Sequence, residues 1–177
     1  MLGLTAALPK HRLFLLGLAA ASCHELGHLT AMAVCGCKPQ CLRLTLLGGK
    51  LTDQSLARLR TEFFSVAAGP AVNLLLAGCF AFSTQYGYRL FSAMNLVLGG
   101  FNLLPIQGMD GGRLLWLAAE QHCSIRRTRR ICIAAACAAL FLLLLWSIWL
   151  WQKHPQLPAL LFFPLVPAVA FFRWLKD

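Results

Sequence analysis

Apolar residues along the chain form five long runs, and short polar or charged stretches separate them. A helix needs about 20 mostly apolar residues to cross ~30 Å of hydrocarbon, and each run is close to that length. All of the runs except the first are free of charged residues. The pattern predicts an all-α polytopic membrane protein, a single membrane-embedded domain over residues 1–177, with spans at about 13–35, 63–83, 90–109, 131–152 and 155–172.

The last of these runs differs from the others because it contains four prolines. Proline has no backbone N–H, so it interrupts the hydrogen-bonding ladder of a helix. We expect this span to be kinked, to start late, or to cross only part of the bilayer. The prolines are Pro155, Pro158, Pro164 and Pro167.

Between the first two spans, the segment 41–52 reads CLRLTLLGGKLT. Apolar and β-branched residues flank Gly48-Gly49, and a Gly-Gly pair readily takes the positive φ of a tight hairpin turn. The segment is therefore interpreted as either a membrane-associated β-hairpin or a plain loop, with nearly equal support for each.

The composition agrees with a membrane protein, because 59% of the residues are hydrophobic and 12% are charged, against roughly 45–50% and about 25% in soluble domains. The net charge is +10. The basic residues lie between the spans, where the positive-inside rule accounts for them, so we expect no nucleic-acid partner. Twelve of them fall on one side of the five spans and four on the other. This imbalance places the N-terminus outside and the C-terminus in the cytoplasm, although Lys10 and Arg12 alone favour the reverse.

Eight cysteines are present, and four of them lie inside apolar runs, where a thiol behaves as a small hydrophobe,. Cys35, Cys37 and Cys41 form the one suggestive cluster. No fourth ligand follows them at a recognisable spacing, so we interpret them as reduced thiols rather than as a metal knuckle.

The first run contains the motif His24-Glu25-Leu26-Gly27-His28. Residues four apart on a helix share a face, so both imidazoles can reach one zinc ion while Glu25 flanks the open coordination position. An ionisable side chain inside a membrane costs on the order of 2.5–3.5 kcal/mol, which makes a purely structural polar cluster the weaker interpretation. The motif predicts a zinc hydrolase site with Glu25 as the catalytic residue.

A catalytic zinc needs a third protein ligand. Asp110 is the one acidic residue between positions 90 and 117, and it follows Pro105 and Gly108, which break regular helix and can turn a side chain back toward a neighbouring helix,. Glu62, at the start of the second span, is the alternative ligand. Asp110 could instead cap a helix with Arg113 as its ion-pair partner.

A third motif, AAGPAVNLLLAG at 67–78, places Asn73 inside an uncharged span. Small residues let helices approach closely, and the amide needs a hydrogen-bond partner in hydrocarbon. Close helix packing and a role in a site explain this motif about equally well.

Together the three motifs resemble the site-2 protease family of intramembrane metalloproteases. HELGH, the AGPxxN pattern at 68–73 and FNLLPIQGMDGGR at 101–113 occur in the order of that family. The compact layout resembles the sporulation branch typified by stage IV sporulation protein FB. We expect neither the CBS domain of that branch nor an inserted PDZ domain within these residues.

The resemblance implies that His24, His28 and Asp110 are zinc ligands, that Glu25 is the general base, and that Asn73 and Asn102 are polar residues near the site, binding substrate or the oxyanion. It implies a membrane-associated protein substrate, such as a sigma-factor precursor in sporulation or an anti-sigma factor. It also implies a bacterial cell membrane with the active site toward the cytoplasm. A regulatory membrane protein or a second copy of the chain is a possible partner.

In this mechanism zinc activates water, and Glu25 moves the proton from the water to the leaving amine. A helical substrate must unwind first, and an edge of the hairpin at 41–52 could hold it by strand addition. The alternative is a membrane protein that binds or transports zinc without proteolysis. A transporter is expected to have repeated halves and several polar relay residues, and the sequence has neither.

Overall fold

The computed structural model describes residues 10–36, 56–155, 162 and 164–176, and all regular structure in this part of the chain is helical. The prediction of an all-α protein is confirmed for these residues. The helices are α1 (Lys10–Val34), α2 (Leu56–Ala81), α3 (Tyr86–Asn102), α4 (Asp110–Glu120), α5 (Ile125–Lys153) and α6 (Leu165–Lys176).

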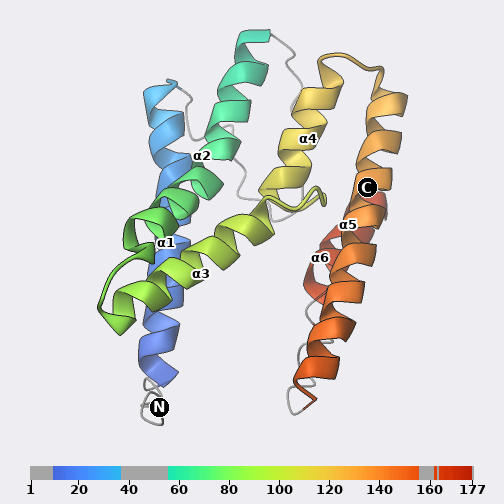
Figure 1. Ribbon diagram of the computed structural model, residues 1–177. Coiled ribbons are helices and arrows are strands. Elements are labelled where there is room, and N and C mark those ends of the chain that lie inside the picture. The colour runs from blue at the N-terminus through green and yellow to red at the C-terminus, as the bar shows by residue number, and fades with distance from the viewer. Residues whose placement is uncertain (1–9, 37–55, 156–161, 163, 177) are drawn as a thin grey trace.

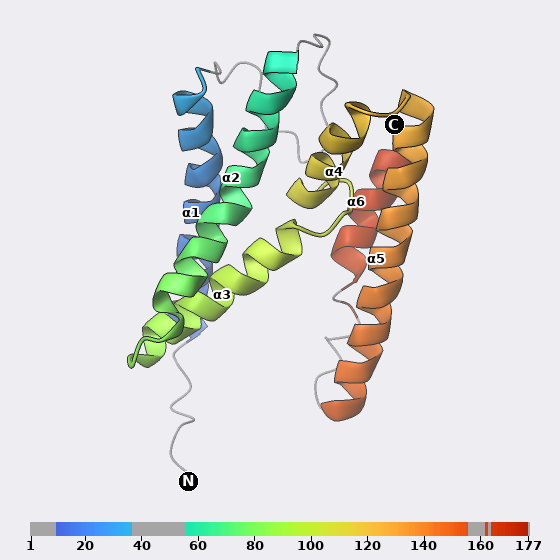
Figure 2. The ribbon, with the colours of Figure 1, turned by 45° about the horizontal axis from the view of Figure 1, so that its top comes forward.

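The helices form two groups joined by the turn between α3 and α4 (Figure 1). α1 and α2 lie side by side in opposite directions, and α3 crosses them diagonally. α5 runs back past α4, and α6 returns along α5 (Figure 2). Along the chain, α1, α2, α3 with α4, α5 and α6 run alternately up and down in Figure 1, which is the order that five membrane crossings require.

Two of the described helices are long and apolar enough to cross a membrane, namely Leu59–Ala81 within α2 and the whole of α5. α1 has the length, at 25 residues, but its His and Glu residues lower its mean hydropathy. α3 and α6 have 17 and 12 residues and are short for a span,. The count of five spans therefore stays a prediction.

The predicted third span, 90–109, is helical only as far as Asn102 and then turns. α3 ends at Asn102 and α4 begins at Asp110. Pro105 has no N–H to continue the ladder, and Gly108 adopts φ +97°, which a helix does not allow,. The sequence indicated this interruption, but it did not predict that helix resumes at Asp110.

In the last apolar run the structure describes a regular helix over Leu165–Lys176, and residues 156–161 and 163 of the predicted span lie outside the described part of the chain. Pro164 directly precedes α6, and Pro167 lies in its first turn, where a missing N–H costs no hydrogen bond. The predicted hairpin at 41–52 lies outside the described residues, as do Cys37 and Cys41. Cys35 is an exposed free thiol just after α1.

The turn between α3 and α4 is packed against the second group of helices. Ile106 is completely buried in a cluster with Ala136 of α5 and Phe171 of α6. A Cβ atom on Gly108 would lie 2.8 Å from the Cβ of Ala170 on α6. α5 and α6 therefore support the turn that precedes Asp110.

α1 and α2 approach each other closely at two glycines. A Cβ atom on Gly27 would lie 2.8 Å from the carbonyl oxygen of Ala68, and a Cβ atom on Gly69 would overlap the ring of His28. Small residues permit this packing between membrane helices, whose association depends on close van der Waals contact. Gly69 in particular leaves the space that the His28 ring occupies.

Candidate metal centre

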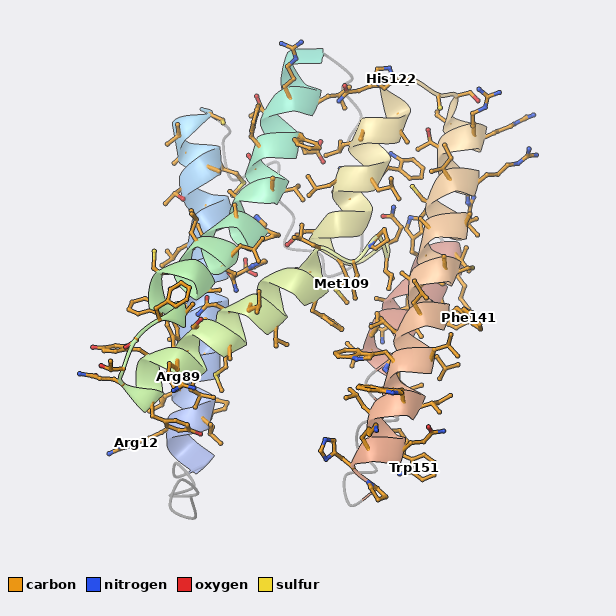
Figure 3. All side chains as sticks on the ribbon, viewed as in Figure 1. Arg12, Arg89, Met109, His122, Phe141 and Trp151 are labelled. Atoms are coloured by element: carbon orange, nitrogen blue, oxygen red, sulfur yellow. The ribbon has the colours of Figure 1, made fainter. Side chains whose placement is uncertain are left out.

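His24 and His28 of α1 converge with Asp110, the first residue of α4. The Nε2 atoms of the two histidines are 3.1 Å apart. Oδ2 of Asp110 lies 3.1 Å from Nε2 of His24 and 3.5 Å from Nε2 of His28. Among the described residues, these three form the one group of His, Cys, Asp or Glu side chains that could hold a metal ion. Met109, labelled in Figure 3, marks the turn beside this point.

The three atoms have the spacing expected of zinc ligands. Zinc bonds of ~2.0–2.1 Å at tetrahedral angles separate neighbouring ligand atoms by about 3.3–3.5 Å, close to the 3.1–3.5 Å observed. Oδ2 of Asp110 is buried and has no hydrogen-bond partner within the described part of the chain. Two imidazoles and one carboxylate leave a fourth position open, as in catalytic zinc sites.

His28 is oriented by the backbone of α2. Its Nδ1 lies 2.8 Å from the carbonyl oxygen of Ser65. A carbonyl can only accept a hydrogen bond, so Nδ1 carries the proton and Nε2 of the neutral ring keeps its lone pair for a metal.

Asp110 is held in place by a tightly packed turn. A Cβ atom on Gly111 or on Gly112 would overlap the backbone of residues 103–107. Gln107 closes the same turn, because its Nε2 donates a hydrogen bond of 2.9 Å to the carbonyl oxygen of Gly112. The N-terminus of α4 also favours a negative charge at its first residue. Packing and the helix dipole therefore both keep the Asp110 carboxylate at this position.

Glu62, the alternative third ligand, pairs with a different residue. Its Oε1 accepts a hydrogen bond of 2.8 Å from Nε of Arg113 and a second one from Nη2 of the same guanidinium. Arg113 therefore pairs with Glu62 on α2, and the interpretation of Asp110 as a cap paired with Arg113 does not describe this structure.

Comparison with known proteins gives several similar proteins, although no family model matches the chain. Zinc metalloprotease MJ0392 of Methanocaldococcus jannaschii is 34% identical over 112 residues, covering 58% of this chain and 33% of the relative. Putative zinc metalloprotease Rip3 of Mycobacterium tuberculosis is 34% identical over 111 residues, covering 55% of this chain and 28% of the relative. Stage IV sporulation protein FB of Bacillus subtilis is 27% identical over 136 residues, covering 68% of this chain and 47% of the relative. The chain thus spans between about a quarter and a half of the length of these relatives.

The fold also has a solved counterpart. The site-2 protease from Methanocaldococcus jannaschii matches with a TM-score of 0.57 and 26% identity, covering 94% of this chain and 77% of that chain. The chain is therefore similar in sequence to zinc metalloproteases and in fold to a site-2 protease. These similarities confirm the resemblance predicted from the three sequence motifs.

The other predicted site residues of this chain, Glu25, Asn102 and Asn73, have different surroundings. Glu25 is exposed on α1. Asn102 ends α3, and its Nδ2 donates a hydrogen bond of 3.2 Å to the carbonyl oxygen of Leu98. Asn73 is completely buried on α2, and its amide has no hydrogen-bond partner among the described residues.

Two contributors to the site were not predicted from the sequence. Ser65 acts through its carbonyl, and a carbonyl is present at every residue, so no sequence signal distinguishes it. Gln107 is the polar residue between Pro105 and Gly108, and its place inside the interrupted segment was a signal that could have been used.

Proposed function

We propose that this protein is an intramembrane zinc metalloendopeptidase that cleaves membrane-associated or transmembrane proteins. The observation that carries the proposal is the convergence of two imidazole nitrogens and one carboxylate oxygen from helices α1 and α4. The names of the relatives agree with proteolysis and do not favour a zinc-binding or transport protein.

His24, His28 and Asp110 are the residues that would hold zinc. Zinc in this position supplies a Lewis acid that polarises the scissile carbonyl and makes water nucleophilic near neutral pH. The protein contributes the arrangement of the ligands. The Ser65 carbonyl fixes the tautomer of His28, and the packed turn before α4 fixes Asp110.

Glu25 is the general base in this proposal. It follows His24 directly, and its side chain is exposed, so it can meet both water and substrate. Its carboxylate takes the proton of the attacking water and returns it to the leaving amine, which needs one group able to act first as base and then as acid. Asn102, at the end of α3, offers an amide donor for the carbonyl oxygen as negative charge develops there.

The substrate class that we propose is a sigma-factor precursor or an anti-sigma factor, as the resemblance of the sequence motifs to the sporulation branch implies. The similarity to stage IV sporulation protein FB supports this proposal. The twelve-to-four distribution of basic residues supports a cytoplasmic active site in a bacterial membrane,. A reporter fused after Asp177 should then read as cytoplasmic, and one inserted at 85–87 as external. The reverse pattern would exclude a cytoplasmic substrate.

The decisive experiment compares the wild type with Glu25→Gln. The variant should retain stoichiometric zinc, because the ligands are unchanged, and should lose cleavage of a panel of sigma-factor precursors and anti-sigma factors. Cleavage by Glu25→Gln at the wild-type rate would overturn the mechanism. Zinc binding by the wild type without cleavage of any membrane substrate would favour the non-proteolytic alternative.

A further inference from the structure

Besides Oδ2 of Asp110, four buried polar atoms on α1, α2 and α3 have no hydrogen-bond partner within the described residues. They are Nδ1 of His24, Oδ1 and Nδ2 of Asn73, and Oδ1 of Asn95. Asn73 and Asn95 are both 0% exposed, and His24 is 6% exposed. A buried polar group without a partner is costly, and more so in a membrane, so a cluster of such atoms calls for an explanation.

The contact between α1 and α2 places His24 at the level of Asn73 along the helix pair. A Cβ atom on Gly27 would lie 2.8 Å from the carbonyl oxygen of Ala68 and 3.0 Å from Cγ2 of Val72. The two helices are antiparallel (Figure 1). His24 is one turn before Gly27 on α1. It therefore lies level with the turn of α2 that begins at Val72 and Asn73.

The contact between α2 and α3 places Asn95 near the same point. A Cβ atom on Gly99 would lie 3.0 Å from the Cβ of Asn73. Further along the pair, Oγ of Ser92 donates a hydrogen bond of 2.6 Å to the carbonyl oxygen of Ala77. Asn95 lies between Ser92 and Gly99, and all three are the buried residues of one face of α3. That face is the one that packs against α2.

The unpartnered atoms are complementary in order. With Nε2 of His24 left for the metal, its Nδ1–H is a donor, Oδ1 of Asn73 an acceptor, Nδ2 of Asn73 a donor and Oδ1 of Asn95 an acceptor. The other end of the Asn95 amide already has a partner, because its Nδ2 donates a hydrogen bond of 2.8 Å to the carbonyl oxygen of Phe91. The series of unpartnered atoms therefore ends at Asn95. Each atom that lacks a partner thus has a suitable one on the next residue.

We propose that His24, Asn73 and Asn95 form a hydrogen-bonded relay, bridged by buried water, in which Asn73 is the positioning residue for the zinc ligand His24. The relay would keep the proton of His24 on Nδ1 and leave Nε2 for the metal, as the Ser65 carbonyl does for His28,. A bridging water is suited to a buried site with several polar partners. This inference rests on the proposed zinc site, and it gives Asn73 a role behind His24, which suits a side chain that is 0% exposed.

The test measures zinc affinity of the full chain in detergent by competition with a chelating dye, and the visible spectrum of the cobalt-substituted protein. Asn73→Leu and Asn73→Ala should each weaken zinc binding about 10- to 100-fold and alter the cobalt spectrum, because an outer partner of a metal ligand is lost. Asn73→Asp keeps an acceptor for Nδ1–H and should stay within about threefold of the wild type. The unfolding temperature of each metal-free variant is measured alongside, so that weaker zinc binding by a folded protein is distinguished from loss of the fold.

Thr128→Val is the matched control. Thr128 is also 0% exposed with an unpartnered hydroxyl among the described residues, but it lies on α5, outside the relay. The control should bind zinc like the wild type. Wild-type zinc binding in Asn73→Leu and Asn73→Ala, or a loss in Asn73→Asp as large as in Asn73→Leu, would overturn the relay while the zinc site stands. Absence of zinc from both the wild type and Thr128→Val would overturn the proposed function and the relay with it.

Discussion

Arg113 of α4 and Glu62 of α2 form an ion pair between residues that are 51 positions apart in the sequence. Both nitrogens that donate belong to one guanidinium, and both hydrogen bonds reach the same carboxylate oxygen. Arg113 is three residues after Asp110, which is one turn of α4. The pair therefore ties the helix that begins with Asp110 to the helix that holds the His28 ring in place.

Breaking this pair should impair the metal centre without removing a ligand. Glu62→Ala or Arg113→Ala leaves a half-buried charge without its partner, and we expect several-fold weaker zinc binding and slower cleavage in each. The double variant Glu62→Arg with Arg113→Glu should recover part of the loss. Glu120→Ala is the control, because Glu120 accepts its hydrogen bond from Trp116 on the same helix. If Glu120→Ala weakened zinc binding and slowed cleavage equally, the losses would come from removing any acidic side chain on α4 or nearby and not from breaking this ion pair.

Asp110→Ala should remove zinc, whereas Glu62→Ala should only weaken its binding. Asp110 supplies an atom of the three-residue group and Glu62 does not. Asp110→Glu should bind zinc more weakly and cleave poorly, since an added methylene displaces the carboxylate by more than the ~0.2 Å tolerance of a metal bond. Metal analysis of the purified variants measures this directly. If Asp110→Ala kept a full equivalent of bound zinc while Glu62→Ala bound none, Glu62 and not Asp110 would be the third ligand.

Gly69→Ala should displace the His28 ring and lower zinc affinity at least about tenfold, because a Cβ atom there overlaps that ring,. Gly78→Ala on the same helix is the matched control. No atom lies within 4 Å of its added Cβ, so it should bind zinc normally and gain about 0.5–1 kcal/mol of stability as Ala replaces Gly in a helix. Normal zinc binding in Gly69→Ala would show that the ring has another position that supports the metal.

Gly108→Ala should lower both stability and activity. Ala at φ +97° is strained, and its Cβ would lie 2.8 Å from the Cβ of Ala170. We expect a loss of about 1–3 kcal/mol in the free energy of unfolding and slower cleavage, as the turn before Asp110 shifts. Adding Ala170→Gly should relieve the contact but not the backbone strain, so recovery should be partial. Gly100→Ala on α3, with open space around its Cβ, should leave cleavage unchanged.

The helical character of the protein and all three candidate ligands, His24, His28 and Asp110, could be predicted from the sequence, with Glu62 as the alternative to Asp110. Long apolar runs predict helices because a membrane offers the backbone no other partners. The spacing of His24 and His28 places both on one helix face wherever that helix lies. The interruption after Asn102 was also predictable, because Pro105 and Gly108 act on the chain locally. The five crossings and the hairpin at 41–52 stay predictions.

Only tertiary contacts decided the rest. Asp110 and Glu62 are both acids next to apolar runs, and Pro105 and Gly108 favoured Asp110 as the ligand without showing where its carboxylate lies. The fold separates them, since Arg113 pairs with Glu62 and leaves the Asp110 carboxylate facing the two Nε2 atoms. The orientation of His28 depends on a backbone carbonyl of α2, which carries no signal in the identity of its residue. Contacts of this kind join residues far apart in the chain, so local spacing and propensity cannot specify them.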